Sequence, residues 1–263
     1  MKNVLFALSI IIPLITFSSC EKTITPTLTN AASQLVIEGA VSDTAGPYHI
    51  NISKTVTFYA DNTYPNVSGA SVTITDETAG VTDLLTETSA GTYTTHTIVG
   101  KPGSTYQLTV IVDGKTYQSS STMPSPVTLD SVTFDYTSIK NMIQPVAYFQ
   151  DPGNFVNYYK FNILKNGVKL NRFQTLEDLL SNGKYIRDQL VTDTGAIKKN
   201  DVVTISLVGI DKNAYNFLQE AENVAFYNDQ LNTPATPESN ISGGCIGYFS
   251  AQTVSSKNAF VSQ

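Results

Sequence analysis

The sequence contains no tryptophan, only two histidines and only two cysteines among its 263 residues. Charged side chains make up 14% of the chain, and its 16 lysines and arginines form no cluster. Surfaces that bind nucleic acids or anionic membranes need such clusters, so neither kind of surface is expected. The cysteine count also excludes a scaffold held together by several disulfides.

The two histidines, His49 and His96, stand in separate strand-like segments with no cysteine or dense carboxylate cluster nearby. A zinc site needs about four well-placed ligands. A serine hydrolase needs a nucleophile with a base and an orienting group, and no Gly-x-Ser-x-Gly motif occurs. We therefore predict no metal, no cofactor and no catalytic residue. The protein is expected not to be an enzyme.

The densest carboxylate pairs are Glu177–Asp178 and Glu220 with Glu222. A glycosidase would need two carboxylates flanking a cleft. We interpret both pairs as solvated surfaces. Asp151 is followed by proline and glycine, a run that favours a turn. The Asp151 carboxylate is expected to accept hydrogen bonds from nearby backbone N–H groups.

The N-terminus begins with a small positive head and continues as an almost wholly apolar stretch from Val4 to Phe17. A membrane-spanning helix needs ~20 apolar residues, so this stretch is typical of a signal peptide instead. The run Phe17-Ser18-Ser19-Cys20 resembles the lipobox of bacterial lipoproteins, although leucine is usual where Phe17 stands. We predict a signal peptide at 1–19 and lipidation of Cys20. The alternative is an ordinary secretory signal with a chance cysteine.

Two acyl chains on Cys20, and a third such as palmitate on its freed amine, would anchor the mature chain. Each buried CH₂ contributes ~0.8 kcal/mol, and a single chain holds only marginally. The residues that follow are rich in threonine and proline, which predicts an extended tether over 20–33. No later segment approaches a spanning length.

Tyrosine (14) and phenylalanine (12) are abundant beside threonine and valine, a composition that favours strands. One run alternates between two faces of a strand, with one face made of Tyr106, Leu108, Val110 and Val112. Asp113-Gly114 then separates this run from a second strand-like run. Such a dipeptide is a strong signal for a two-residue hairpin. Further turn signals recur at short spacing, so we predict an immunoglobulin-like β-sandwich at 34–124.

Two prolines, Pro124 and Pro126, mark a boundary, and 127–263 is predicted to form a second, mostly β domain, also an immunoglobulin-like β-sandwich but with one packed helix. Asn166-Gly167 predicts another hairpin, and Ile246 to Val254 predicts a final strand. One helix is expected near 213–227, with Asp211 or Asn213 as its cap. Its apolar positions are Ala214, Phe217, Leu218, Ala221, Val224 and Ala225.

Three smaller features of this second half have structural and functional interpretations. Cys245 lies among small and apolar residues and is interpreted as a buried small hydrophobe. Gly243-Gly244 is expected to permit a tight turn or a close backbone approach. The aromatic residues could form platforms for carbohydrate, although at strand spacing half of them should belong to the core; they are Tyr158, Tyr159, Tyr227, Tyr248 and Phe249.

Several stretches taken together resemble a lipoprotein family of the Bacteroidota that is catalogued as domain of unknown function 4249. The order of these stretches covers nearly the whole chain after residue 19, although no single stretch is specific. They are Cys20-Glu21-Lys22, Leu35-Val36-Ile37-Glu38-Gly39, Val67-Ser68-Gly69-Ala70-Ser71-Val72, Gly91-Thr92-Tyr93, Gly103-Ser104-Thr105-Tyr106-Gln107-Leu108, Asp113-Gly114-Lys115-Thr116-Tyr117, Asp151-Pro152-Gly153, Asn157-Tyr158-Tyr159, Ser239-Asn240-Ile241-Ser242-Gly243-Gly244 and Gly247-Tyr248-Phe249-Ser250. The family more often has alanine where Cys245 stands.

The resemblance implies a lipoprotein anchored to the outer membrane of the cell envelope, with exposure at the cell surface as one alternative. It also implies an accessory or binding role beside a TonB-dependent receptor. No reaction is assigned to the family, so the resemblance implies no catalytic residue. Two other functions stay open from the sequence. One is binding of a surface glycan or peptide without a transporter, and the other is a hydrolase with an unrecognised site.

Overall fold

The computed structural model describes residues 32–57, 63–136, 142–226 and 236–262. The predicted signal peptide, Cys20 and the predicted tether as far as residue 31 lie outside the described residues. One compact unit extends over Ser33–Gln263 and contains both segments that the sequence predicts as domains. In the part of the chain that the structure describes, no helix has the length and apolarity needed to cross a membrane.

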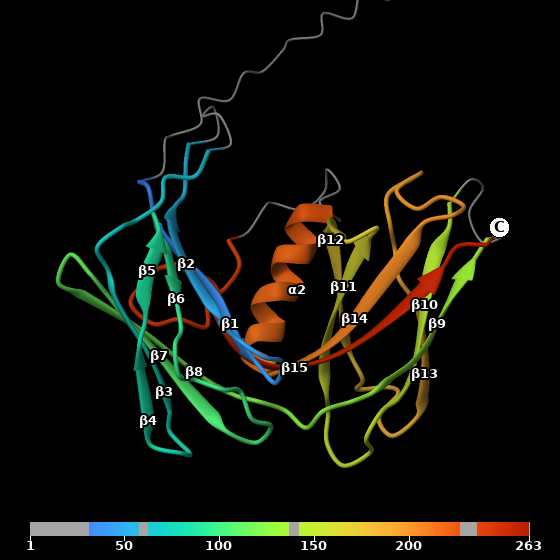
Figure 1. Ribbon diagram of the computed structural model, residues 1–263, viewed down its shortest axis with the longest axis horizontal. Helices are drawn as coiled ribbons and strands as arrows, with labels where there is room; N and C mark the ends of the chain where they lie inside the picture. Colours follow the sequence, from blue (N-terminus) through green and yellow to red (C-terminus); the bar gives the residue numbers. More distant parts are fainter. Residues whose placement is uncertain (1–31, 58–62, 137–141, 227–235, 263) are drawn as a thin grey trace, which may run out of the picture. The chain divides into compact units, whose positions relative to one another are not determined.

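The fold is mainly β with a sandwich architecture, as predicted (Figure 1). The first half contributes one complete sheet, whose order is β4-β3-β7-β8. Those strands are Val81–Leu84, Ser71–Asp76, Thr105–Val112 and Lys115–Thr122. Four more strands of this half lie side by side in an eight-stranded sheet and are β1 (Leu35–Ser42), β2 (His49–Lys54), β6 (Thr92–Thr94) and β5 (Thr86–Ser89).

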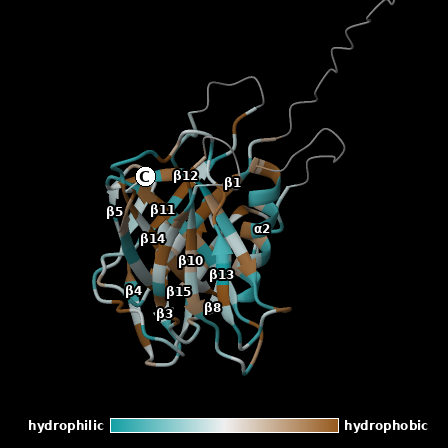
Figure 2. Ribbon diagram, turned by 90° about the vertical axis from the view of Figure 1, so that its right-hand side faces the viewer, coloured by the Kyte–Doolittle hydropathy of each residue, from teal (hydrophilic) through white to brown (hydrophobic). Residues whose placement is uncertain are grey.

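These two layers enclose the first hydrophobic core. On β7, Tyr106, Leu108 and Val110 are completely buried, whereas Ile111 on the other face is 42% exposed. The predicted alternation is therefore confirmed, and each fully buried side chain contributes ~1.5–3 kcal/mol. Alternating hydrophobic and hydrophilic bands are visible along the strands (Figure 2).

Both predicted hairpins form. Asp113 and Gly114 have φ angles of 50° and 76° between β7 and β8, and Asn166 and Gly167 have 50° and 82°. Two consecutive positive φ angles are what a type I′ turn requires, and this turn matches the twist of the strands that it joins.

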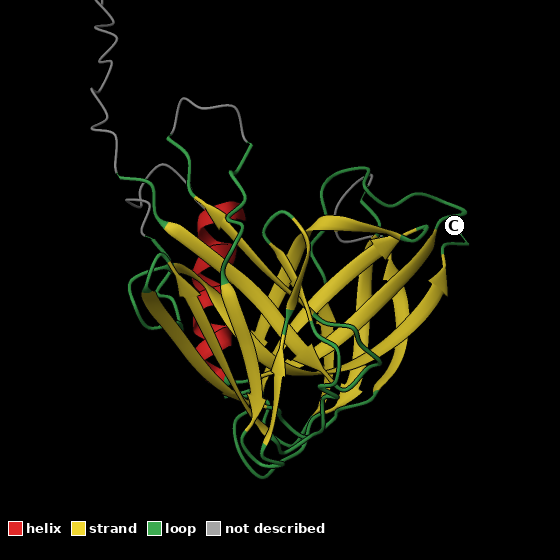
Figure 3. Ribbon diagram, turned by 60° about the vertical axis from the view of Figure 1, so that its left-hand side comes forward, coloured by secondary structure: helices red, strands yellow, loops and turns green. Residues whose placement is uncertain are grey.

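The second half repeats the two-layer arrangement (Figure 3). Three of its strands continue the eight-stranded sheet and are β12 (Val168–Glu177), β11 (Tyr158–Lys165) and β14 (Val202–Ile210). Three others form a separate sheet in the order β13 (Tyr185–Gln189), β10 (Gln144–Gln150) and β9 (Leu129–Asp135). A second core that includes Phe149, Phe161 and Leu207 is built from both layers.

The last strand, β15 (Ile246–Phe260), joins the two halves. Its first residues pair in parallel with β1 from Val36↔Ile246 to Ser42↔Gln252. Its later residues pair antiparallel with β14 as far as Val202↔Phe260. The strand is longer than the predicted Ile246–Val254 because its final residues are held by backbone pairing and not by an apolar pattern.

A glycine permits the contact between β1 and β15. Gly247 has a φ of 118°, and a Cβ atom at this position would lie 1.9 Å from the carbonyl oxygen of Ile37. Residues near the C-terminus also complete the first core, to which Ile241, Cys245 and Phe249 belong. The predicted boundary at Pro124 and Pro126 lies between β8 and β9, while β15 belongs to both halves.

The predicted helix is α2 (Lys212–Phe226), and it packs on β12, β15 and β11. Asp211 is its cap, because one of its carboxylate oxygens accepts from the N–H groups of Asn213 and Ala214 at 2.9 and 3.1 Å. The buried face differs from the prediction, since Val224 is 37% exposed and Glu222 is buried. The Glu222 carboxylate accepts from the backbone N–H of Thr175 at 2.8 Å, on the edge strand β12.

Candidate functional site

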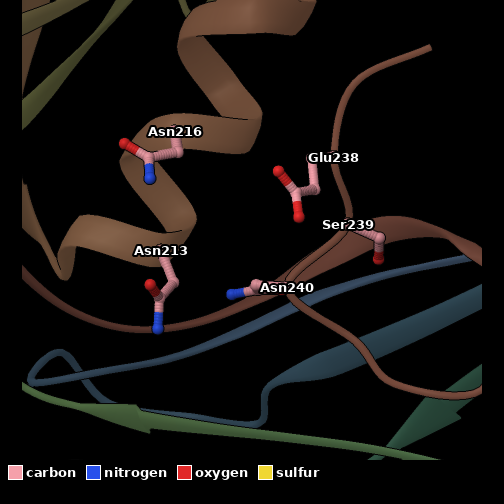
Figure 4. A pocket seen from close by; sticks show the side chains of 5 residues that line it. All are labelled: Asn213, Asn216, Glu238, Ser239 and Asn240. Carbon is pink, nitrogen blue, oxygen red and sulfur yellow. The ribbon is translucent and has the colours of Figure 1, made fainter.

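A polar pocket of about 170 Å³ lies between the start of α2 and the segment that precedes β15. Its described lining consists of side chains that carry amide, hydroxyl or carboxylate groups and comprises Asn213, Asn216, Glu238, Ser239 and Asn240. In Figure 4 the side chains of Glu238 and Asn240 extend from this segment toward α2, which carries the other two asparagines.

The helix wall of the pocket is fixed by the N-terminal cap. Ser121 on β8 donates a hydrogen bond from its hydroxyl to Asp211 and accepts one from the backbone N–H of Ala251 on β15 at 2.7 Å. Asp211 is thereby tied to two strands while it caps the helix. Asn213 and Asn216 are three residues apart, so they lie on the same side of α2, away from the sheet.

The opposite wall is fixed by hydrogen bonds to β15. Asn240 donates from Nδ2 to the carbonyl oxygen of Phe249 at 2.8 Å and accepts from the Phe249 N–H at 3.0 Å. Ser239 donates from Oγ to the carbonyl oxygen of Gly247 at 2.7 Å. The N–H of Glu238 donates to the Glu220 carboxylate at 2.7 Å, so the helix also holds this segment.

The turn after this segment confirms the interpretation of the paired glycines. Gly243 and Gly244 have φ angles of 97° and 75°. A Cβ atom on Gly243 would lie 2.7 Å from the ring of Tyr117 and 2.9 Å from the carbonyl oxygen of Thr116, so this turn makes a close approach to β8.

The two histidines lie apart from this pocket. His49 Nδ1 shares a hydrogen bond with Thr94 at 3.0 Å, and His96 Nε2 shares one with Thr86 at 2.8 Å. Across the ranges that the structure describes, no group of three or more histidine, cysteine, aspartate or glutamate side chains is placed to hold a metal ion.

The prediction of solvated surfaces is wrong for one member of each carboxylate pair, since Asp178 and Glu222 are buried, whereas Glu220 is exposed and Glu177 is half-buried. Asp178 is completely buried, and Asp151 is 1% exposed. Asp151 accepts from the hydroxyl of Tyr159 and, at 2.8 Å, from the backbone N–H of Gly183, a residue distant in the sequence. One oxygen of Asp178 accepts from the N–H of Asn157 at 2.9 Å, and the other has no hydrogen-bond partner among the described residues.

Burial and the neighbouring Asp151 raise the pKa of Asp178 to about 6. Both effects disfavour the charged form, because a carboxylate loses its hydration and meets a second negative charge. The sequence shows no sign of this pair, since Asp151 and Asp178 belong to different loops. The network ties the segment before β11 to the segment after β12.

Most of the predicted aromatic platforms belong to the core. Tyr159 and Phe249 are 1% and 0% exposed. The ring of Tyr158 packs on Tyr215 at a centroid distance of 5.0 Å, and that of Tyr248 stacks on Phe217 at 5.5 Å. Tyr227 lies outside the described residues.

A lysine occupies the same aromatic region beneath α2. Lys160 is 9% exposed, and burial lowers its pKa to about 8. Its Nζ lies 4.9 Å from the ring centroid of Phe173 and 5.7 Å from that of Tyr248. These distances are typical of cation–π contacts, which replace part of the lost hydration. The burial of Lys160 could not be predicted from the sequence, because a single lysine in a strand is usually exposed.

Cys245 is buried, as predicted, and loss of hydration raises the pKa of its thiol. A raised pKa disfavours the thiolate, which is the reactive form. Cys20, the predicted lipidation site, lies outside the described residues.

A comparison with protein families matches residues 21–258 to the family described as a domain of unknown function, DUF4249. A comparison with curated proteins finds no match. The family match begins directly after Cys20 and ends within β15, so it covers both halves of the eight-stranded sheet. The chain belongs to the DUF4249 family.

Proposed function

We propose that the protein is a lipoprotein of the cell envelope that acts as a non-enzymatic binding or accessory module on the outer membrane. The observation that carries the proposal is the order of the N-terminal segments. A short apolar stretch is followed by Ser18-Ser19-Cys20, a threonine- and proline-rich stretch and then the compact unit that begins at Ser33.

The spacing of these parts fits a tethered body. Residues 21–32 span at most about 40 Å when fully extended. A lipid on Cys20 would therefore hold the compact unit close to the membrane while leaving its surfaces accessible. Two or three acyl chains give the stable attachment that one chain does not.

The partner in this proposal is an outer-membrane receptor of the TonB-dependent class, which the family resemblance implies. Co-purification from native membranes, with the full chain as bait, tests this part separately. Recovery of such a receptor supports the partner, and its absence from a preparation that retains the lipoprotein contradicts it.

The anchor itself is tested by substituting each cysteine in turn. Cys20→Ala should abolish the mass increase of the acyl chains and move the protein from the membrane fraction to the soluble fraction. Cys245→Ala is the matched control, because it removes the other thiol. It should leave the added acyl mass and the membrane fractionation unchanged. A wild-type chain without acyl mass would overturn the proposal.

Binding of a surface glycan or peptide without a transporter is the second candidate function. The polar pocket between α2 and Glu238–Asn240 favours it, because this pocket presents hydrogen-bonding groups from two separate segments.

A further inference from the structure

We propose that the polar pocket between α2 and the Glu238–Asn240 segment binds one neutral, hydroxyl-rich ring, such as a sugar unit of a glycan. This inference deepens the proposed function, on which it rests for its biological setting. Its physical basis is the set of hydrogen-bonding groups that line the pocket.

The unused hydrogen-bonding capacity of the lining is the first argument. The side chains of Asn213, Asn216 and Glu238 make no hydrogen bond with other described residues. Asn240 uses one of its two amide N–H groups on Phe249 and retains the other, and its Nδ2 points toward α2 (Figure 4). Because β15 fixes this amide, a ligand need not order it on binding.

The combination of donors and acceptors selects the class of ligand. The asparagine amides offer both kinds of group, and Glu238 offers only acceptors. A hydroxyl group both donates and accepts, so a polyol can satisfy both kinds in one small volume. An apolar ligand would leave these groups unpaired at a cost in free energy.

Charge argues against the other small ligands. No lysine or arginine is among the described residues that line the pocket, and Glu238 would repel an anion. A calcium ion prefers six to eight oxygen ligands, and the fixed N–H of Asn240 turns a positive dipole end toward the space that it would occupy. A neutral ligand meets neither obstacle.

The volume of the pocket limits the size of the ligand. A cavity of roughly 150 Å³ accommodates benzene, so a pocket of about 170 Å³ accommodates one six-membered ring. No aromatic residue is among the lining residues described, so binding depends on hydrogen bonds alone. A single sugar unit should therefore bind with a dissociation constant of about 1 mM or weaker.

The test is calorimetric or NMR titration of the full-length lipoprotein, purified in a detergent without a sugar headgroup. The probes are glucose, galactose, mannose and N-acetylglucosamine as neutral rings, with glucuronate and calcium chloride as charged alternatives. At least one neutral ring should bind saturably, and the two charged probes should bind more weakly.

Two pairs of variants locate the binding. Asn216→Ala and Glu238→Ala should each weaken binding of the neutral ring about 10-fold, as expected for loss of one hydrogen bond. Asn171→Ala and Glu77→Ala make the same changes at exposed positions outside the pocket and should leave the affinity unchanged. Circular dichroism of all four variants verifies that they fold.

Three results would overturn the inference. They are the absence of saturable binding by every neutral ring, binding that the pocket variants do not weaken, and a preference for one of the charged probes. These results are independent of the acyl mass and membrane fractionation, so failure of the pocket and failure of the anchor are distinguished.

Discussion

The buried pair Asp151–Asp178 should make the stability of the protein fall as the pH rises from about 4 to 7. In the folded chain the pKa of Asp178 is raised to about 6, from an ordinary value of 3.8, because the group is buried beside a second carboxyl. A proton on the unpartnered oxygen of Asp178 can be donated to Asp151, which satisfies both groups. Deprotonation leaves two buried negative charges in contact.

The sign and the size of this pH dependence follow from the shift in the pKa of Asp178. The folded chain binds the proton more tightly than the unfolded chain, so the contribution is complete below pH 3.8 and is lost as the pH rises through about 6. A shift of roughly two pKa units corresponds to about 3 kcal/mol. For a protein of this size that is a fall in Tm of roughly 6–12 °C between pH 4 and pH 7.

Asp178→Asn supplies a permanent amide donor to Asp151 and should remove this part of the pH dependence. The assay is thermal or urea unfolding at several pH values between 4 and 8. Asp188, whose pKa burial also raises to about 6, accounts for the slope that remains in the variant. The control is Asp113→Asn, which keeps a good hairpin turn and should retain the full wild-type slope.

The reasoning is refuted if Asp178→Asn shows the same slope as the wild type. It is also refuted if wild-type stability rises steadily over this range. Asp178→Ala, which provides neither donor nor acceptor, should be less stable than Asp178→Asn at every pH, because the N–H of Asn157 loses its partner.

Three further changes and one control substitution test other contacts in the fold. Gly247→Ala should cost more than about 3 kcal/mol or prevent folding, because its Cβ would overlap Ile37. Gly244→Ala has no close neighbour and should cost only about 1 kcal/mol, and urea unfolding compares the two. Lys160→Met should raise the unfolding free energy by about 1–2 kcal/mol at pH 7, because burial disfavours the ammonium and the aromatic contacts offset only part of this. This gain should shrink between pH 8 and 10.5, as the wild-type lysine loses its proton. Tyr159→Phe removes a donor from a buried carboxylate and should lower the melting temperature through a loss of about 1–3 kcal/mol.

Features fixed by neighbouring residues could be predicted from the sequence. The alternation that begins at Tyr106, the turn at Asp113-Gly114 and the cap at Asp211 all involve residues within a few positions of each other. Local propensity and periodicity carry enough information for such elements.

Features that join distant segments could not be predicted. The pairing of Val36 with Ile246 and the hydrogen bond from Thr175 to Glu222 depend on how the sheet is assembled. Glu222 looks like a solvated helical glutamate until β12 is known to be an edge strand. Nothing in the sequence indicates that Gly247 lies against Ile37, because this contact exists only once β1 and β15 are paired.

The candidate pocket could be predicted only in part. The three-residue spacing of Asn213 and Asn216 after the cap predicts that both share one side of a helix. Nothing in the sequence indicates that Glu238 and Asn240 face them, because hydrogen bonds to β15 set that position.

The measurement that tests the central claim most directly is the intact mass of the protein recovered from membranes. The account predicts a mature chain that begins at Cys20 and carries the added mass of two or three acyl chains. A chain that begins elsewhere, or one that begins at Cys20 without acyl mass, would contradict it.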